Sequence, residues 1–336
     1  MKVAIVRLSA LGDIIVSAVF LPYLKAIRPD MEIHWFVDEV FGGILEDSPC
    51  IAKLWQLPLK KISKSKNIFE AFRMAKNLRM LEKYDVVIDL QGLIKSSVIG
   101  SMLKKDRFIG FDKHSIREKI ASVFYNQKVS IPYENNILER NMALFEGVIG
   151  AKMGLENCLE NRKNAFGYSS SAGAKINDLF LGEKRKIVLF VLEASNDNKS
   201  YPIEQYAKLA GLIKDLNLKI VLLWYGYFDR AQKLRDQICH FVDVLVLPKL
   251  DLDTIKALIA RVDLVVGGDT GVTHLSWAMQ RASITLYGNT PVERFELRGE
   301  KNISLSGNLK ANYDKNDFSI RAIPPEDINE AMRRIL

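Results

Sequence analysis

Residues 265–276 have the sequence Val265-Val266-Gly267-Gly268-Asp269-Thr270-Gly271-Val272-Thr273-His274-Leu275-Ser276. The preceding segment, Val262 to Val266, is mainly apolar and predicts a short buried strand, while apolar side chains recur at helical spacing from Val272 to Met279. A strand, a glycine-rich turn and the beginning of a helix therefore follow one another. Such units build parallel sheets that are covered by helices on both faces.

The turn itself has the composition of an anion-binding site. Three glycines within five residues allow a tight turn and close approach of a ligand, and the free amides at a helix start attract phosphate. Asp269, Thr270 and His274 add groups that can orient a hydroxyl or a diphosphate. Alternatively, Asp269 or Thr270 caps the helix and His274 packs in the core, and residue types alone leave both interpretations open.

Length and charge set the class of protein. A chain of 336 residues, 48% of them apolar, is long enough for two domains with separate cores. Its net charge of +8 and pI near 9.2 favour an acidic partner, which can be nucleic acid, anionic lipid or a phosphorylated small molecule.

The cysteines and the hydropathy pattern predict a soluble protein of a reducing cytoplasm. Cys50, Cys158 and Cys239 are widely spaced and lack a CxxC pair, so neither a disulfide framework nor a zinc site is expected. The apolar run from Ile14 to Leu24 directly follows the polar Gly12-Asp13 pair, and no run reaches the ~18 apolar residues of a membrane span. Any contact with a membrane is therefore expected to be peripheral.

Strand patterns alternate with helical patterns along both halves of the chain. The predicted elements of the first half are the strands Lys2–Arg7, Glu32–Val37, Ile51–Leu57 and Tyr84–Leu90 and an apolar helix from Asp13 to Ala26. The predicted strands of the second half are Arg185–Leu192, Leu218–Trp224, Val242–Leu247, Val262–Val266 and Ile284–Tyr287. The predicted fold class is α/β, with two doubly wound parallel-sheet domains facing a central cleft, because such sheets bind ligands beyond the carboxyl ends of their strands.

Composition also predicts the domain boundaries. Residues 1–156 form the first domain and residues 183–318 the second. Residues 157–182 are polar and rich in serine and glycine, so they are expected to be a linker with a helix inside it. The final segment, 319–336, is an amphipathic helix that is expected to pack back on the N-terminal domain.

Two polar turns lie at the ends of predicted strands in the first half. Asp13, in Leu8-Ser9-Ala10-Leu11-Gly12-Asp13, can accept a proton from a substrate hydroxyl as a general base, or can cap the following helix. The turn Asp89-Leu90-Gln91-Gly92 closes a later strand and matches a wall of the same site. Turns also use these residue types for their own hydrogen bonds, so both interpretations stay open.

Lysines mark two further segments. Lys60, Lys61 and Lys64 lie in a predicted basic loop, which is either a solvated surface or a site for a small polyanion, since scarce aromatics argue against single-stranded nucleic acid. Lys199 follows the first strand of the second half, where it is either a surface lysine or a counter-charge for a diphosphate leaving group, and Ser195 before it can cap or hold phosphate. The chain has neither a P-loop nor a GxGxxG fingerprint.

Taken together, several segments are similar to the ADP-heptose:lipopolysaccharide heptosyltransferase family, especially to its heptosyltransferase I branch. The segments are Arg7–Asp13, Asp85–Ser96 and Gly268–Leu275, with further similarity in Ile116–Asn126, Leu247–Lys249 and Ile284–Gly288. The resemblance covers nearly the whole chain. It implies a GT-B fold with two Rossmann-like domains, in which the first mainly binds the acceptor and the second mainly binds ADP-heptose.

The resemblance also implies an inverting transfer of L-glycero-D-manno-heptose from ADP-heptose to Kdo of Kdo2-lipid A, in the lipopolysaccharide inner core. Asp13 would deprotonate the Kdo hydroxyl, and Lys199 would meet the diphosphate and the heptose. The donor-binding positions implied by the family are Ala194, Ser195, Lys199, Asp229, Leu250, Asp269, Thr270, Gly271 and His274. The implied acceptor-binding positions are Ser9, Gly12, Lys60, Lys61, Lys64, Gln91 and Arg117.

Two donor positions depart from the family pattern. Family members often carry a Thr-Thr pair before the lysine, where this chain has Ala194-Ser195, and Asp229 matches the ribose-binding acid only across an alignment gap. No metal-ligand cluster is visible in the sequence, so no obligatory cofactor is expected, although a divalent cation can still stimulate the reaction. The expected protein is a monomer at the cytoplasmic face of the inner membrane, in peripheral contact with the anionic surface and without a nucleic-acid partner.

Three other functions stay open to experiment. Heptosyltransferase II or III would share the donor residues and differ only at the acceptor. A noncatalytic protein that binds anionic lipid or nucleic acid would fit the net charge and would tolerate the substitution Asp13→Ala. A nicotinamide-dependent dehydrogenase is opposed by the missing dinucleotide fingerprint.

Overall fold

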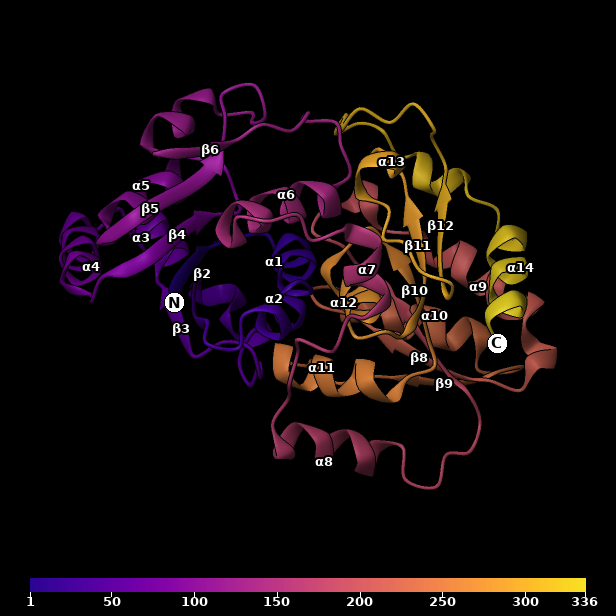
Figure 1. The fold of residues 1–336 in the computed structure, drawn as a ribbon. Helices are drawn as coiled ribbons and strands as arrows, with labels where there is room; N and C mark the ends of the chain where they lie inside the picture. Colours follow the sequence, from indigo (N-terminus) through magenta and orange to yellow (C-terminus); the bar gives the residue numbers. More distant parts are fainter. The chain divides into compact units, whose positions relative to one another are not determined.

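The computed structural model describes residues 1–336. The chain divides into two compact units, Met1–Gly167 and Tyr168–Leu336, and each is built on a six-stranded parallel sheet with flanking helices (Figure 1). Counted within its own unit, each sheet has the strand order 3-2-1-4-5-6, which is the doubly wound Rossmann order. The predicted α/β class is therefore confirmed.

The sheet of the first unit has the order β3-β2-β1-β4-β5-β6. Its strands are β1 (Lys2–Val6), β2 (Glu32–Asp38), β3 (Lys53–Leu57), β4 (Tyr84–Asp89), β5 (Lys105–Phe111) and β6 (Gln127–Val129). The helices are α1 (Leu11–Ala18), α2 (Leu21–Ile27), η1 (Glu39–Ile44), α3 (Leu59–Ser65), α4 (Ile68–Met80), α5 (Ile94–Met102), η2 (Lys119–Phe124), α6 (Ile137–Ile149) and α7 (Leu155–Glu160). Beyond their first residues β1 and β2 are buried throughout, as expected for strands covered on both faces.

The sheet of the second unit has the order β12-β11-β10-β7-β8-β9. Its strands are β7 (Ile187–Val191), β8 (Lys219–Leu223), β9 (Asp243–Val246), β10 (Leu264–Gly268), β11 (Ala282–Tyr287) and β12 (Asn302–Ser306). The helices are α8 (Ser170–Leu179), η3 (Asp197–Lys199), α9 (Ile203–Leu212), η4 (Lys214–Leu216), α10 (Phe228–Ile238), α11 (Leu252–Arg261), α12 (Gly271–Ala278), α13 (Val292–Phe295), η5 (Ser319–Ala322) and α14 (Pro325–Ile335).

Each sheet has one switch point, where the order of the strands reverses. In the first unit it lies between β1 and β4, whose ends are paired through Val6 and Asp89. In the second unit it lies between β7 and β10, which are paired through Val191 and Gly267. Loops that leave neighbouring strands in opposite directions open space at such points, and ligands of open α/β sheets bind there.

Two predictions about local structure in the first unit are wrong. The helix expected over Asp13 to Ala26 is divided into α1 and α2, because Pro22 lies in the first turn of α2 and has no amide to continue α1. The basic run expected to be a loop is helix α3, because Leu59 and Ile62, three residues apart, give it an inward face. Lysines therefore occupy its outward side.

The segment between the two sheets and the end of the chain both contain helices. The segment 157–182, for which a linker with a helix inside it was predicted, contains the end of α7 and the whole of α8, which packs on α11. Helix α14 packs on α9 and buries Ile328, Ala331 and Met332 in the core of the second unit. Its apolar face is thus covered within that unit, and packing of this helix on the N-terminal domain stays a prediction. No helix has both the length and the apolar character needed to cross a bilayer.

Candidate active-site groups at the two switch points

The turn after β1 holds the carboxylate of Asp13 close to Arg7. Arg7 is 5% exposed, and its guanidinium lies 3.0 Å from Asp13 Oδ2 while it also donates to the Leu90 carbonyl oxygen. The same Asp13 oxygen accepts the Ala10 amide at 3.3 Å, so Asp13 supports the start of α1 from the third helical position. Its side chain is 37% exposed, and Oδ1 has no protein partner. The capping role and a free basic oxygen therefore coexist.

A buried hydrogen-bond network fixes the turn after β4. Asp89 is fully buried, and its Oδ1 accepts the amides of Gln91 and Gly92 at 2.8 and 3.1 Å. Its Oδ2 accepts the hydroxyls of Ser96 and Tyr125, both at 2.8 Å. Burial raises the pKa of the Asp89 carboxyl, although these four hydrogen bonds oppose the rise. Asp89 therefore shapes the turn and has no surface from which to contact a substrate.

Gln91 connects the two turns of the first switch point. Its Oε1 accepts the Leu8 amide at 2.9 Å, and its Nε2 donates to Ser9 Oγ at 3.2 Å. Gly12, half-buried, directly precedes Asp13 in the same turn. The structure thus brings together four of the residues predicted from the sequence, namely Ser9, Gly12, Asp13 and Gln91.

The predicted basic contacts lie on other elements of the first unit. Lys60, Lys61 and Lys64 project from α3, and Lys61 pairs with Glu70 at 3.2 Å. Arg117 is exposed in the segment that leads to η2. None of these four cations hydrogen-bonds to the turns around Asp13, so they stay candidates for an anionic ligand that extends beyond the switch point.

The second switch point brings together three residues, one from η3 after β7, one from the turn after β10 and one from helix α12. Lys199 Nζ lies 2.5 Å from Asp269 Oδ2, and His274 Nε2 lies 2.9 Å from Asp269 Oδ1. The side chains of Asp269 and His274 are only 6% and 9% exposed, whereas that of Lys199 is 24% exposed. Lys199 is therefore the member of this cluster that reaches solvent.

Protonation in this cluster follows from its charges. Burial by itself would raise the pKa of the Asp269 carboxyl, but the His274 hydrogen bond and the Lys199 charge outweigh burial and hold that pKa well below its usual range. An ionised Asp269 only accepts hydrogen bonds, so His274 Nε2 carries the hydrogen. His274 Nδ1 is then buried and has no hydrogen-bond partner among the protein's own groups. Such an atom needs a ligand or a water.

Two of the three glycines of this turn, Gly267 and Gly268, allow close packing of the protein against itself. A Cβ at Gly267 would lie 2.7 Å from Val191 Cβ, and one at Gly268 would overlap the Lys199 carbonyl oxygen. The sequence interpretation assigned this close approach to a ligand, whereas the structure assigns it to the neighbouring strand and loop. Thr270 occupies the N-cap of α12, but its side chain makes no capping hydrogen bond.

The remaining predicted donor positions lie in separate loops of the second unit. Ser195 is exposed, and the Ala194 amide is bonded to Ser200 Oγ at 3.0 Å. Asp229 is exposed in the first turn of α10, and Leu250 is half-buried just before α11. No hydrogen bond joins Ser195, Asp229 or Leu250 to the cluster around Asp269, so the structure leaves their roles as predictions.

Two charged residues near strand ends complete these loops, and sequence patterns did not single them out. Arg7 orients Asp13, as described above. Glu193 accepts the amides of Gly226 and Tyr227 at 2.7 and 2.8 Å, and so ties the loop after β7 to the loop after β8. In the sequence, these two residues could have been found only as charged side chains that lie within two residues of the end of an apolar strand.

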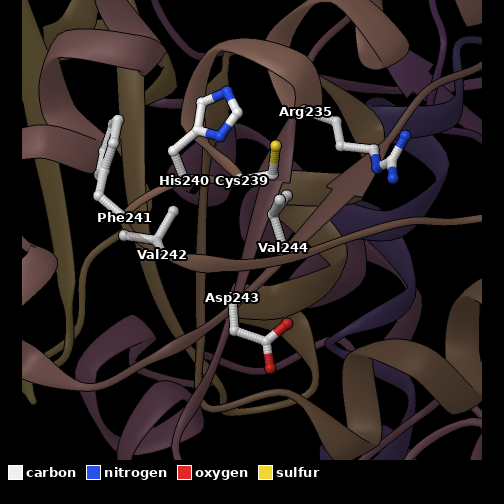
Figure 2. A pocket seen from close by; sticks show the side chains of 7 residues that line it. All are labelled: Arg235, Cys239, His240, Phe241, Val242, Asp243 and Val244. Atoms are coloured by element: carbon white, nitrogen blue, oxygen red, sulfur yellow. The ribbon is translucent and has the colours of Figure 1, made fainter.

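The surface pocket shown in Figure 2 is separate from both switch points. It extends from the end of α10 to β9 and is lined by Arg235, Cys239, His240, Phe241, Val242, Asp243 and Val244. None of these residues belongs to the predicted site. No group of three His, Cys, Asp or Glu side chains is arranged to hold a metal ion.

Comparison with known proteins gives the family. The model of glycosyltransferase family 9 (heptosyltransferase) matches residues 71–320. The chain is 36% identical to lipopolysaccharide heptosyltransferase 1 of Campylobacter coli, over 100% of this chain and 99% of that protein. It is 30% identical to lipopolysaccharide heptosyltransferase 1 of Escherichia coli strain K12, over 86% of this chain and 88% of that protein.

The fold agrees with a solved structure of the same family. The structure of E. coli heptosyltransferase WaaC with ADP matches with a TM-score of 0.80 at 23% identity and covers 100% of both chains. The family inferred from the three sequence segments is thus confirmed by sequence identity along the whole chain. The chain belongs to glycosyltransferase family 9, the heptosyltransferases.

Proposed function

We propose that this enzyme transfers L-glycero-D-manno-heptose from ADP-heptose to Kdo of Kdo2-lipid A, with inversion at the anomeric carbon. Support for the first heptose step comes from the two relatives described above, both named lipopolysaccharide heptosyltransferase 1. The observation that carries the mechanism is the carboxylate of Asp13, which Arg7 holds through one oxygen while the other is free.

In the proposed reaction Asp13 acts as the general base. Its Oδ1 takes the proton of the Kdo hydroxyl as that oxygen forms a bond to the anomeric carbon of the heptose. The bond from this carbon to the diphosphate breaks, and ADP leaves with the bonding electrons. Attack from the side opposite the leaving group inverts the configuration. A positioned base of this kind contributes about 10²–10⁴-fold to the rate.

The donor is proposed to bind at the second switch point. The ammonium of Lys199 offsets the charge of the diphosphate, and the amides of Thr270 and Gly271 at the start of α12 hold phosphate oxygens. His274 Nδ1, which has no protein partner, accepts a hydrogen bond from a hydroxyl of the heptose beside Asp269. Asp229 is assigned to the ribose hydroxyls, and the further donor contacts are Ala194, Ser195 and Leu250.

The acceptor is proposed to bind at the first switch point. Ser9, Gly12 and Gln91 surround the Kdo sugar next to Asp13. The carboxylates of Kdo and the phosphates of lipid A bind to the cations Lys60, Lys61, Lys64 and Arg117. The enzyme works as a monomer in peripheral contact with the cytoplasmic face of the inner membrane. No metal is obligatory because Lys199 and helix amides offset the leaving charge, and a divalent cation would only stimulate the reaction.

The test follows ADP release from ADP-heptose with de-acylated Kdo2-lipid A as acceptor. Asp13→Asn retains an oxygen for the Ala10 amide but cannot accept the proton, so release should fall by about 10²-fold or more while donor binding persists. The matched control is Asp30→Asn, which removes a carboxylate paired with Arg28 at 3.1 Å on the surface of the same unit. This control should keep the wild-type rate.

Each outcome decides one part of the proposal. Full activity of Asp13→Asn would return Asp13 to a purely structural role. Transfer only to an acceptor that already carries a heptose would move the assignment to heptosyltransferase II or III. Loss of activity in a metal chelator, restored by a divalent cation, would contradict the absence of an obligatory metal.

A further inference from the structure

We propose that the outward face of helix α4 docks on an anionic phospholipid bilayer. This inference rests on the peripheral membrane location proposed above and names the surface that makes the contact. Helix α4 follows the basic helix α3 and packs against α3 and α5 within the first unit (Figure 1). Its inward face is apolar, as expected for a helix that packs on a protein core, with Leu78 buried and Met74 half-buried.

The outward face of α4 carries four large apolar side chains among its charged ones. Ile68, Phe69, Phe72 and Met80 are 79%, 88%, 70% and 69% exposed. At the helical repeat of about 3.6 residues these four positions fall on the same half of the helix, opposite Leu78. Single exposed apolar residues are common on soluble proteins, but four large ones on one helix make a patch of the kind that marks an interaction site.

The folding of the helix does not account for these side chains. The helix start is held by Asn67, whose Oδ1 accepts the amides of Phe69 and Glu70 at 3.0 and 3.2 Å. The rings of Phe69 and Phe72 contact no other aromatic ring and no cation. Because the two side chains are 88% and 70% exposed, polar residues there would remove little packing, and most of their apolar surface is buried only when another apolar phase covers it.

The positive charge around these rings indicates that the apolar phase covering them is an anionic membrane. From Leu59 to Met80 the chain has one acidic residue, Glu70, and seven basic ones, Lys60, Lys61, Lys64, Lys66, Arg73, Lys76 and Arg79. Glu70 is 20% exposed and pairs with Lys61, so it offsets one of these seven cations and leaves six. Large apolar side chains among lysines and arginines are typical of helices that lie in the interface of anionic bilayers. Two copies of such a face would repel each other.

The experiment measures co-sedimentation with vesicles that contain no acceptor. We compare phosphatidylcholine vesicles with vesicles that carry about one-third phosphatidylglycerol. Wild type should bind the anionic vesicles, with affinity falling as salt rises, and Phe69→Ser/Phe72→Ser should bind them about tenfold more weakly or worse. The matched control is Leu181→Ser/Leu309→Ser, which removes two side chains of 87% and 92% exposure from the second unit. It should bind like wild type.

Three results would overturn the docking proposal. These are equal binding of the phenylalanine variant and wild type, equal binding of wild type to both vesicles, and a wild-type dimer that the phenylalanine substitutions dissociate. The last result would assign the face to a second copy of the chain. Both variants should unfold at the wild-type temperature and release ADP at the wild-type rate with the soluble de-acylated acceptor. A lack of turnover with intact vesicle binding would therefore sink the proposed reaction alone.

Discussion

Arg7 and Asp13 are joined across the turn that follows β1, with the guanidinium 3.0 Å from one carboxylate oxygen. Arg7 also donates to the carbonyl oxygen of Leu90, so one buried side chain connects the turns after β1 and β4. The orientation of the Asp13 carboxylate, the proposed base, therefore depends on Arg7 as well as on helix α1. This makes Arg7 a positioning residue whose removal can be tested.

Arg7→Ala should lower kcat about 10- to 100-fold, because the base loses the group that orients it. The KM for ADP-heptose should stay near the wild-type value, since the proposed donor residues belong to the other unit. Stability should fall by about 1–3 kcal/mol, because the Leu90 carbonyl loses a buried donor. Steady-state ADP release and urea unfolding measure the two effects.

The control for Arg7 is Arg28→Ala, which removes an exposed guanidinium paired with Asp30. It should change neither kcat nor the urea midpoint. A rise in the KM for ADP-heptose larger than the fall in kcat would contradict the positioning role of Arg7 and would implicate it in donor binding.

Asp269→Asn should destabilise the protein at pH 7 by about 3 kcal/mol, because it breaks a buried ion pair and a histidine hydrogen bond. The folded state lowers the pKa of this carboxyl, so the stabilisation is fully present above the ordinary aspartate pKa of about 4 and is lost as the pH falls further. Calorimetry should therefore find a constant Tm difference between wild type and variant from about pH 8 to 5 that narrows below about pH 4. A difference that widens toward acid would refute this account.

Asp89→Ala should cost about 3 kcal/mol or more, because two amides and two hydroxyls lose their buried acceptor. Asp85 offers a control in the same strand, since it is exposed and accepts only the Lys2 amide, at 2.7 Å. Asp85→Ala should shift the urea midpoint much less. Equal shifts would mean that the Asp89 network is not what holds the turn after β4.

Sequence patterns were sufficient for the central strands of both sheets and insufficient for some of the outer ones. Strands such as β1 and β10 are uniformly apolar because helices cover both of their faces. The strands that were not predicted are β5, β6 and β12, which lie toward the sheet edges. β5 begins with Lys105-Asp106-Arg107, β6 has three residues, and β12 is only half-buried, so none has a clear apolar pattern.

For the site, spacing placed Asp13 and Asp269 at strand ends but did not reveal their partners. Lys199 is 70 residues from Asp269, and Arg7 is 83 residues from Leu90. These pairs meet because the order of the strands reverses between β7 and β10 and between β1 and β4. Long-range strand pairing sets that order, and the local sequence does not contain it. Family resemblance was therefore needed to group the residues before the structure showed which of them touch.

A substitution at Gly268 tests whether the position of Lys199 matters for turnover. A Cβ at this residue would overlap the carbonyl oxygen of Lys199, so Gly268→Ala should push η3 away from β10 and separate Lys199 Nζ from Asp269. We expect stability to fall by about 1–3 kcal/mol and ADP release to slow about tenfold or more. Thermal unfolding and steady-state ADP release measure the two effects.

Gly211, near the end of α9, is the matched control, because a Cβ there would meet no atom within 4 Å. Gly211→Ala should raise stability by about 0.5–1 kcal/mol, since alanine restricts the unfolded chain and favours helix, and it should leave turnover unchanged. The two variants add the same methyl group with opposite expected effects, so a general sensitivity to alanine cannot explain the pattern. Wild-type turnover in a Gly268→Ala enzyme that is destabilised as expected would show that the contact serves folding alone.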